Sequence, residues 1–272
     1  MFYEVKNGII EVKGIECLNL ELTLDCGQAF RWQKCEDGSF VGCATDKPLK
    51  VSEENGTYFF EWCSEKDFLN FWVNYFDLNT DYAKICESLK QDSLLSKTID
   101  EYYGIRILKQ NSFEALFSFV ISQQNNIKRI KLIIEKICRK YGKDLGHDIF
   151  SFPDIEVLVN CTEQDFAELG CGYRAKYLYR LCQDVYDGKI DLDYIASLSY
   201  EDAKKELLKI FGVGVKVADC ALLFGFGFVD AFPIDVWMKR VMEYYPNGLP
   251  KCFDGYKGIA QQYLFHWARN NL

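Results

Sequence analysis

The chain has 272 residues, of which 49% are hydrophobic, and its formal net charge is −8. The length allows one large domain or two smaller ones, and the apolar fraction excludes a disordered chain. No run of about 18 or more apolar residues occurs, and residues 1–14 lack the basic, apolar and small-residue order of a signal peptide. We therefore expect a soluble, intracellular, cytoplasmic protein with no membrane partner.

The cysteines are spread singly along the chain, from Cys17 to Cys252, with no Cys-Xaa-Xaa-Cys pair. Disulfide frameworks are typical of short secreted chains, so this spread favours reduced and mostly buried thiols. Zinc and iron–sulfur sites need ligands at short spacing, and only Cys220 and Cys252 lie in the last quarter. We predict no metal and no other cofactor.

Residues 1–62 are predicted to form β-structure. The pairs Asn7-Gly8, Asp37-Gly38 and Asn55-Gly56 lie between alternating or aromatic segments such as FRWQKC and TYFFEW. Pairs of this kind are typical of tight hairpin turns. This part of the chain is therefore expected to be a meander of antiparallel hairpins.

From about residue 65 the apolar period changes to that of helices, and Gly and Pro mark breaks rather than linkers. The order of sheet first and helices afterwards predicts an α+β protein with segregated parts, divided into residues 1–80 and residues 81–272. The expected helices cover residues 65–76, 81–89, 94–103, 112–122, 127–141, 163–170, 174–186, 200–211, 216–226, 235–245 and 256–271.

A very short Gly-Val-Gly turn joins YEDAKKELLKIF to KVADCALLFGF. Gly212 and Gly214 can take positive φ and bring bare backbone close to a ligand, and the second helix presents free N–H groups at its start. This geometry suits a phosphate. A plain tight turn between two helices is the open alternative.

Lys216 stands at the start of that second helix, where the helix dipole opposes a cation. The dipole and partial burial both disfavour the charged form, which makes Lys216 a candidate nucleophile for Schiff-base chemistry. A lysine that reaches solvent or binds a phosphate directly is the alternative.

Asp235 precedes a helical pattern and is the expected N-cap of that helix. The preceding helix is roughly 16 Å long and the connecting loop can span about 25 Å, so the chain can return to the lysine. An amine beside a fixed carboxylate and a phosphate-binding turn fits attack on a sugar carbon, that is, cleavage of an N-glycosidic bond. Simple capping by Asp235 is the alternative.

A basic run occupies residues 127–143, where seven Lys and Arg residues face a single Glu135. The overall negative charge counts against a nucleic-acid partner, but phosphate contacts depend on local positive potential. A solvated helix face is the alternative interpretation of such a run.

The span from about 200 to 245 resembles the helix-hairpin-helix/GPD superfamily of DNA glycosylases, whose signature is a glycine hairpin, a lysine and a downstream aspartate. Further motifs resemble its 8-oxoguanine DNA glycosylase branch: LDCGQAFRW (24–32), LFSFVISQQNNIKRI (116–130), LGCGYRAKYL (169–178) and GIAQQYLF (258–265). The resemblance implies a TBP-like sheet before a helix-hairpin-helix core. It also implies a monomeric, chromosome-associated enzyme that uses no nucleotide cofactor and acts on double-stranded DNA containing 8-oxoguanine.

The resemblance implies that Lys216 is the nucleophile, that Asp235 is the catalytic carboxylate, and that base excision is followed by β-elimination at the abasic site. The Gly27 carbonyl is then expected to accept the N7 proton that 8-oxoguanine has and guanine lacks. By the same resemblance, Cys220 and Phe265 sandwich the flipped base. Gln261 reads its Watson–Crick edge, and lies four residues from Phe265 on one helix face.

The resemblance also implies an element that fills the gap in the duplex and contacts the orphan base. Asn125 is expected to occupy the gap, Tyr173 to wedge the stack, and Arg129 with Arg174 to contact the estranged cytosine. Four residues depart from the family pattern. Gln124 replaces an asparagine, and Phe211 replaces a proline of the hairpin. Trp237 replaces a histidine, and Ala268 replaces the acidic residue that pairs with that histidine in the family.

Two rival classes remain at this point. An alkylpurine glycosylase of the same superfamily generally lacks the lysine, so Lys216 argues against it. A non-catalytic helix-hairpin-helix DNA-binding module has no need for Lys216, Asp235, Gln261 and Phe265 together. The iron–sulfur branch is disfavoured because the C-terminal cysteine cluster is missing.

Overall fold

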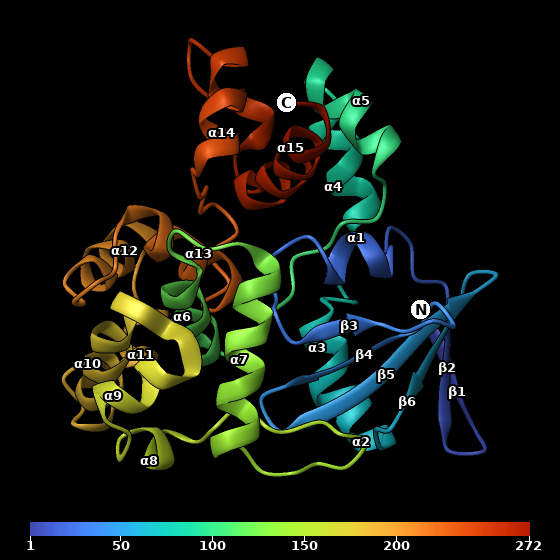
Figure 1. The fold of residues 1–272 in the computed structure, drawn as a ribbon. Helices are drawn as coiled ribbons and strands as arrows, with labels where there is room; N and C mark the ends of the chain where they lie inside the picture. Colours follow the sequence, from blue (N-terminus) through green and yellow to red (C-terminus); the bar gives the residue numbers. More distant parts are fainter.

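The computed structural model describes residues 1–272 and begins with a six-stranded antiparallel sheet (Figure 1). The Asn-Gly turns at 7–8 and 55–56 have positive φ at both residues, as tight hairpins require. They join β1 to β2 and β5 to β6, and the third predicted turn joins β3 to β4. The strands are β1 (Phe2–Lys6), β2 (Ile9–Lys13), β3 (Trp32–Lys34), β4 (Phe40–Ala44), β5 (Lys47–Glu54) and β6 (Thr57–Glu61).

The sheet is not the simple meander that the sequence predicted, because its order is β1-β2-β6-β5-β4-β3. After β2 the chain passes through α1 (Leu20–Leu24) and joins the sheet at the opposite edge as β3. Pairing of β2 with β6 places Ile10 beside Phe60 and buries both in one apolar face. The sequence missed α1, since five residues capped by Asn19 are too short to show a helical period.

The rest of the chain is helical, as predicted, and also contains three short helices that were not predicted, at Ile155–Leu158, Leu192–Ser197 and Lys251–Phe253. The helix expected over 65–76 is formed by three consecutive pieces. The elements are α2 (Glu65–Asp67), η1 (Phe68–Trp72), α3 (Val73–Tyr75), α4 (Tyr82–Leu89), α5 (Ser93–Glu101), α6 (Ser112–Ser122), α7 (Ile127–Tyr141), α8 (Ile155–Leu158), α9 (Glu163–Phe166), η2 (Ala167–Cys171), η3 (Gly172–Arg174), α10 (Ala175–Tyr186), α11 (Leu192–Ser197), α12 (Tyr200–Leu208), α13 (Val215–Phe224), α14 (Val236–Val241), η4 (Met242–Tyr244), η5 (Lys251–Phe253) and α15 (Lys257–Asn271).

Two apolar cores hold these elements together. One core joins the sheet to α2–α3 through fully buried aromatic side chains such as Phe60, Trp72 and Phe76. The other core lies among the helices, where α13 packs on α6 and α15 packs on α14 and α5 (Figure 1). The α+β class is therefore confirmed, whereas the division of the chain at residue 80 stays a prediction.

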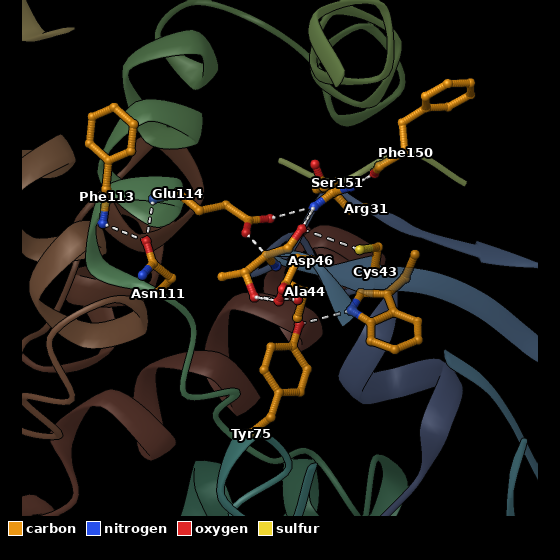
Figure 2. A network of polar contacts seen from close by, with 12 residues as sticks. Arg31, Cys43, Ala44, Asp46, Tyr75, Asn111, Phe113, Glu114, Phe150 and Ser151 are labelled. Atoms are coloured by element: carbon orange, nitrogen blue, oxygen red, sulfur yellow. Dashed lines mark hydrogen bonds and ion pairs between the residues drawn. The ribbon is translucent and has the colours of Figure 1, made fainter. Parts of the chain in front are cut away.

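A buried ion pair fastens the sheet to α6 (Figure 2). Arg31 Nη1 lies 3.4 Å from Glu114 Oε1, with side chains that are 8% and 10% exposed. Glu114 also accepts a bond from the Thr45 backbone N–H at 2.9 Å, and Arg31 donates to the carbonyls of Thr45 and Phe150. This pair fixes the start of α6, and the far end of α6 reaches the candidate site.

Candidate active site

The predicted hairpin between α12 and α13 is present, but its two glycines differ. Gly212 has a φ of +86°, and a Cβ there would lie 2.3 Å from Cγ of Tyr177. Gly214 has a φ of −97°, which corrects the expectation that both glycines take positive φ. Gly214 is the N-cap of α13, and a Cβ there would meet nothing within 4 Å. The hairpin therefore needs Gly212 for its turn and packing, while Gly214 leaves open backbone at the helix start.

A polar cluster that the sequence did not reveal holds the two hairpin helices together. Asp219 on α13 is 3% exposed and pairs with Lys204 of α12 at 2.8 Å. The Tyr200 hydroxyl donates to the same carboxylate at 2.8 Å. Because a buried carboxylate needs partners, this cluster fixes α13 relative to α12.

Lys216 is the second residue of α13, as expected, and forms no ion pair. Its Nζ lies 3.5 Å from Oγ of Ser122 and 5.3 Å from the centroid of the Phe119 ring, both on α6. Since no carboxylate lies within ion-pair distance, the amine keeps its hydrogen-bonding capacity for a substrate.

Asp235 is the N-cap of α14, as the sequence predicted. One of its carboxylate oxygens accepts bonds from the backbone N–H groups of Trp237 and Met238, both at 2.9 Å. These two bonds hold the carboxylate in one position at the start of α14. The cap therefore holds a fixed negative charge at the wall of the cavity that Lys216 also lines.

A single small cavity gathers six of the predicted residues from distant parts of the chain. Its volume of about 40 Å³ leaves room for only a few water molecules. The cavity is therefore narrow, and half-buried Phe265 is the most accessible of its ring-bearing walls. The lining residues are Gly27, Phe119, Lys216, Cys220, Phe224, Pro233, Asp235, Gln261, Gln262 and Phe265.

Gly27 and Cys220 each have a physical reason to be the residue they are. Gly27 has a φ of +90°, and a Cβ there would lie 3.0 Å from Cδ1 of Ile127, so only glycine fits without strain. Burial raises the pKa of the Cys220 thiol, although Lys216 opposes this shift. The wall beside Lys216 is therefore a neutral thiol, suited to packing against a flat base.

The sequence missed four lining residues, of which Gln262 is the most polar. It is 4% exposed, and its Nε2 donates to Oε1 of Gln261 at 2.7 Å. Its position beside Gln261 in GIAQQYLF was the only signal in the sequence. That signal is weak, because consecutive residues of a helix normally point in different directions.

Arg174 holds the loop that precedes α7. It is 5% exposed and donates to the carbonyls of Gln123, Gln124 and Cys171. Its guanidinium also lies 4.5 Å from the ring centroid of Tyr173, which is 45% exposed. The expected contact of Arg174 with an estranged cytosine stays a prediction, and the bonds described here give it a structural role as well.

Asn125 and Arg129 lie on either side of the N-cap of α7. Asn125 is partly buried, and its Nδ2 donates to the carbonyl of Ile121 at 3.3 Å. Arg129 is exposed and has no ion-pair partner. The structure thus brings the loop residues close to Tyr173 and Arg174, as the resemblance implied, whereas their roles on DNA stay predictions.

Most of the basic run on α7 is neutralised within the protein. Lys131, Arg139, Lys140 and Lys143 form ion pairs with nearby aspartates. Lys128, Arg129 and Lys136 form none, and Lys128 and Arg129 stand in the first turn of α7, next to the loop at residues 123–126. Only a few of these bases are thus free for phosphate.

The departures from the family pattern have clear structural settings. The Arg240 guanidinium lies 5.0 Å from the Trp237 ring centroid, and Ala268 on α15 is fully buried. Gln124 is exposed with a φ of +48°. Phe211 is exposed and packs edge-on against Tyr177. The Arg240 guanidinium thus lies beside the ring that replaces the histidine.

Metal ligands and membrane-spanning segments are absent from the described structure. No group of three or more His, Cys, Asp or Glu side chains is arranged to hold a metal ion. All the cysteines are free thiols. None of the helices combines the length and the apolar character that crossing a bilayer requires.

Family models match nearly the whole chain. Residues 10–116 match the model of the 8-oxoguanine DNA glycosylase N-terminal domain, and residues 117–251 match that of the HhH-GPD superfamily base excision DNA repair proteins. The boundary between the two matched regions, at residues 116 and 117, lies in the middle of α6 and beyond the predicted division at 80.

Relatives with names and solved structures are similar over most of the chain. An N-glycosylase/DNA lyase of Saccharomyces cerevisiae is 30% identical over 83% of this chain and 68% of its own length. A probable N-glycosylase/DNA lyase of Methanothermobacter thermautotrophicus is 33% identical, over 72% and 73%. The structure of the Clostridium acetobutylicum 8-oxoguanine glycosylase/lyase, in complex with double-stranded DNA containing cytosine opposite 8-oxoguanine, has a TM-score of 0.93. It is 39% identical and covers 100% of this chain and 98% of its own.

Proposed function

The chain belongs to the 8-oxoguanine DNA glycosylase branch of the HhH-GPD base excision repair superfamily, and from this premise we propose a two-step reaction on damaged DNA. It releases 8-oxoguanine from duplex DNA and then cleaves the strand at the abasic site. The observation that carries the proposal is the single cavity shared by Lys216, Asp235 and four residues suited to hold a base.

In the first step, the neutral amine of Lys216 attacks C1′ of the deoxyribose. The bond from C1′ to the base breaks, and the base leaves with the bonding electron pair and acquires a proton. A covalent bond from Nζ to C1′ forms while the amine passes one proton to the leaving base. The C1′–O4′ bond then breaks, its electron pair stays on O4′, O4′ takes the second amine proton, and a C1′=N Schiff base remains. The amine stands in the first turn of α13, and burial keeps the Cys220 thiol on the same helix neutral, so this thiol adds no charge beside the amine.

Asp235 acts by electrostatics in this step. Positive charge develops on the sugar as the glycosidic bond lengthens, and a fixed carboxylate stabilises that charge. Because two backbone N–H groups hold its oxygen, Asp235 needs no reorganisation during the reaction. In the second step the Schiff base acidifies the C2′ proton. Removal of the C2′ proton breaks the C3′–O bond, and the 3′ phosphate leaves with the bonding electron pair.

The cavity walls supply base recognition. The Gly27 carbonyl accepts the N7 proton of 8-oxoguanine, Cys220 and Phe265 pack against its two faces, and Gln261 bonds its Watson–Crick edge. The positive φ of Gly27 supports this role, because it exposes the backbone where a side chain would otherwise stand.

Double-stranded DNA is the partner, bound by a monomer that uses no nucleotide cofactor. The support is local charge, because the chain carries −8 overall but has free cations close to the site. Three basic residues on α7, α14 and α15 form no ion pair: Arg129, Lys239 and Arg269. Arg269 lies over the Phe265 ring at 5.6 Å. Cations without an ion-pair partner are suited to phosphate contacts, whose strength falls with salt.

The test is borohydride trapping on duplex DNA carrying 8-oxoguanine opposite cytosine. The wild-type protein should become covalently linked to DNA, and Lys216→Gln should lose linkage while it still binds the damaged duplex. Lys209→Gln is the matched control, because Lys209 is exposed on the same hairpin and pairs with Glu206. Binding without any trapping by the wild-type protein would favour a non-catalytic DNA-binding module instead.

A second experiment addresses the orphan-base element. Arg174→Ala should change the relative rates of cleavage opposite the four bases, because the loop that Arg174 holds contains Asn125. An unchanged preference would overturn the assignment of this element.

A further inference from the structure

A chain of buried hydrogen bonds runs beneath the cavity. The Cys26 thiol donates to Oε1 of Gln262 at 3.4 Å, and Nε2 of Gln262 donates to Oε1 of Gln261 at 2.7 Å. Nε2 of Gln261 in turn donates to the carbonyl of Pro233 at 3.1 Å. Cys26, Gln261 and Gln262 are each no more than 4% exposed. This series of hydrogen bonds thus links the Gly27 loop to the segment just before Asp235.

The carbonyl of Pro233, the last acceptor, fixes the direction of every hydrogen bond in this series. A carbonyl can only accept, so Gln261 must turn its amide nitrogen toward Pro233 and its oxygen toward Gln262. Gln262 must then offer its nitrogen to Gln261 and its oxygen to Cys26. Burial raises the pKa of the Cys26 thiol to about 11, so the thiol is protonated at neutral pH. Its single proton is shared between Oε1 of Gln262 and the Thr23 carbonyl oxygen, which both lie 3.4 Å from Sγ.

The orientation of the Gln261 amide determines which base it fits. 8-Oxoguanine has an acceptor at O6 and a donor at N1–H, whereas 8-oxoadenine has a donor at N6 and an acceptor at N1. The two bases share the N7 proton, so the Gly27 carbonyl alone cannot separate them. An amide that turned over would exchange its donor and its acceptor and would suit the adenine-type edge.

We propose that Gln262 is a positioning residue that locks the Gln261 amide in the orientation that fits a guanine-type edge, and that the Cys26 thiol supports Gln262 by donating to its oxygen. This inference rests on the proposed function. Turning the Gln261 amide over would break its bond to Gln262 and would place two oxygens face to face at Pro233. A buried polar group left without a partner is costly, so the locked orientation prevails.

The test compares single-turnover release of 8-oxoguanine and of 8-oxoadenine by the wild-type protein and by Gln262→Met, which keeps the volume and removes the bonds. The ratio of the two rates, 8-oxoguanine over 8-oxoadenine, should fall about tenfold or more in the variant. Where 8-oxoadenine release is too slow to time, the ratio of binding affinities in a Lys216→Gln background serves instead. Cleavage of a duplex with a preformed abasic site should be unchanged, because that step reads no base.

Cys26 provides an independent pair of variants if Gln262→Met folds poorly. Cys26→Ala removes the donor and should lower the ratio, whereas Cys26→Ser keeps a donor and should preserve most of it. A ratio within about twofold of wild type in both Gln262→Met and Cys26→Ala overturns the inference, as does an equal loss of abasic-site cleavage. If the wild-type protein releases no 8-oxoguanine, the proposed function fails and this inference fails with it.

Discussion

Removal of the negative charge from the buried ion pair between the sheet and α6 should strongly destabilise the protein. Glu114→Gln keeps the shape of the side chain and an acceptor for the Thr45 N–H, but leaves the Arg31 guanidinium without a counter-charge. Burial works against the charge on Arg31, and the Glu114 carboxylate outweighs it, so the pKa of Arg31 is raised above its usual value.

The expected loss follows from what Arg31 keeps and what it loses. An uncompensated buried charge typically costs about 3–5 kcal/mol. Arg31 retains its bonds to the carbonyls of Thr45 and Phe150, which places Glu114→Gln near the lower end, at about 3 kcal/mol. That loss is a large share of the roughly 5–15 kcal/mol by which proteins are stable.

Equilibrium unfolding in urea, followed by circular dichroism, measures this loss. A double-mutant cycle sharpens it: Arg31→Met should cost less in the Glu114→Gln background than in the wild-type protein, because the buried charge it would orphan is already gone. A loss below about 1 kcal/mol for Glu114→Gln, or strict additivity in the cycle, would refute the reasoning.

Three further predictions concern the hairpin, a buried thiol and the rim of the cavity. Gly212→Ala should lower the free energy of unfolding by about 2–4 kcal/mol, because of positive φ and the clash with Tyr177, whereas Gly214→Ala should cost about 1 kcal/mol or less in the same urea experiment. The Cys26 thiol has its pKa raised by burial from 9.0 to about 11, so the folded state holds a proton that the unfolded state releases. Stability should therefore fall as pH rises from about 9 to about 11, and Cys26→Ser, which does not titrate there, should fall less over that window; an identical pH profile would contradict the assignment. Arg269→Ala should weaken duplex binding and reduce the slope of log affinity against log salt by about 0.9, and an unchanged slope would show that Arg269 contacts no phosphate.

Features that depend on neighbouring residues were predictable from the sequence. The Asn-Gly pairs formed the expected hairpin turns, because the φ values that such turns need are accessible to those residues at low cost. Asp235 caps its helix as predicted, since its donors are only two and three residues away. The motifs around Lys216, Gln261 and Phe265 also indicated that these side chains belong to one site.

The sheet order could not be predicted, because α1 is too short to show a period and nothing local indicates that β2 pairs with β6. The sequence also did not show which basic residues of α7 lack an ion-pair partner. Lys131 pairs with Asp25, 106 residues away, and only the packing of α7 beside β3 brings the two together. Arg174 was expected to face DNA, and its burial against the Gln123 carbonyl depends on how the loop before α7 folds back.

The sequence by itself determined the α+β class, the glycine hairpin, the lysine at the helix start and the aspartate cap, because each is settled by atoms within a few residues along the chain. Only the tertiary structure decided which polar groups satisfy one another across the cavity. Cys26 and Gln262 are 236 residues apart, and the orientation of the Gln261 amide depends on both of them and on Pro233. Such orientations are fixed by the need to satisfy buried donors and acceptors, and that need exists only once the elements have packed.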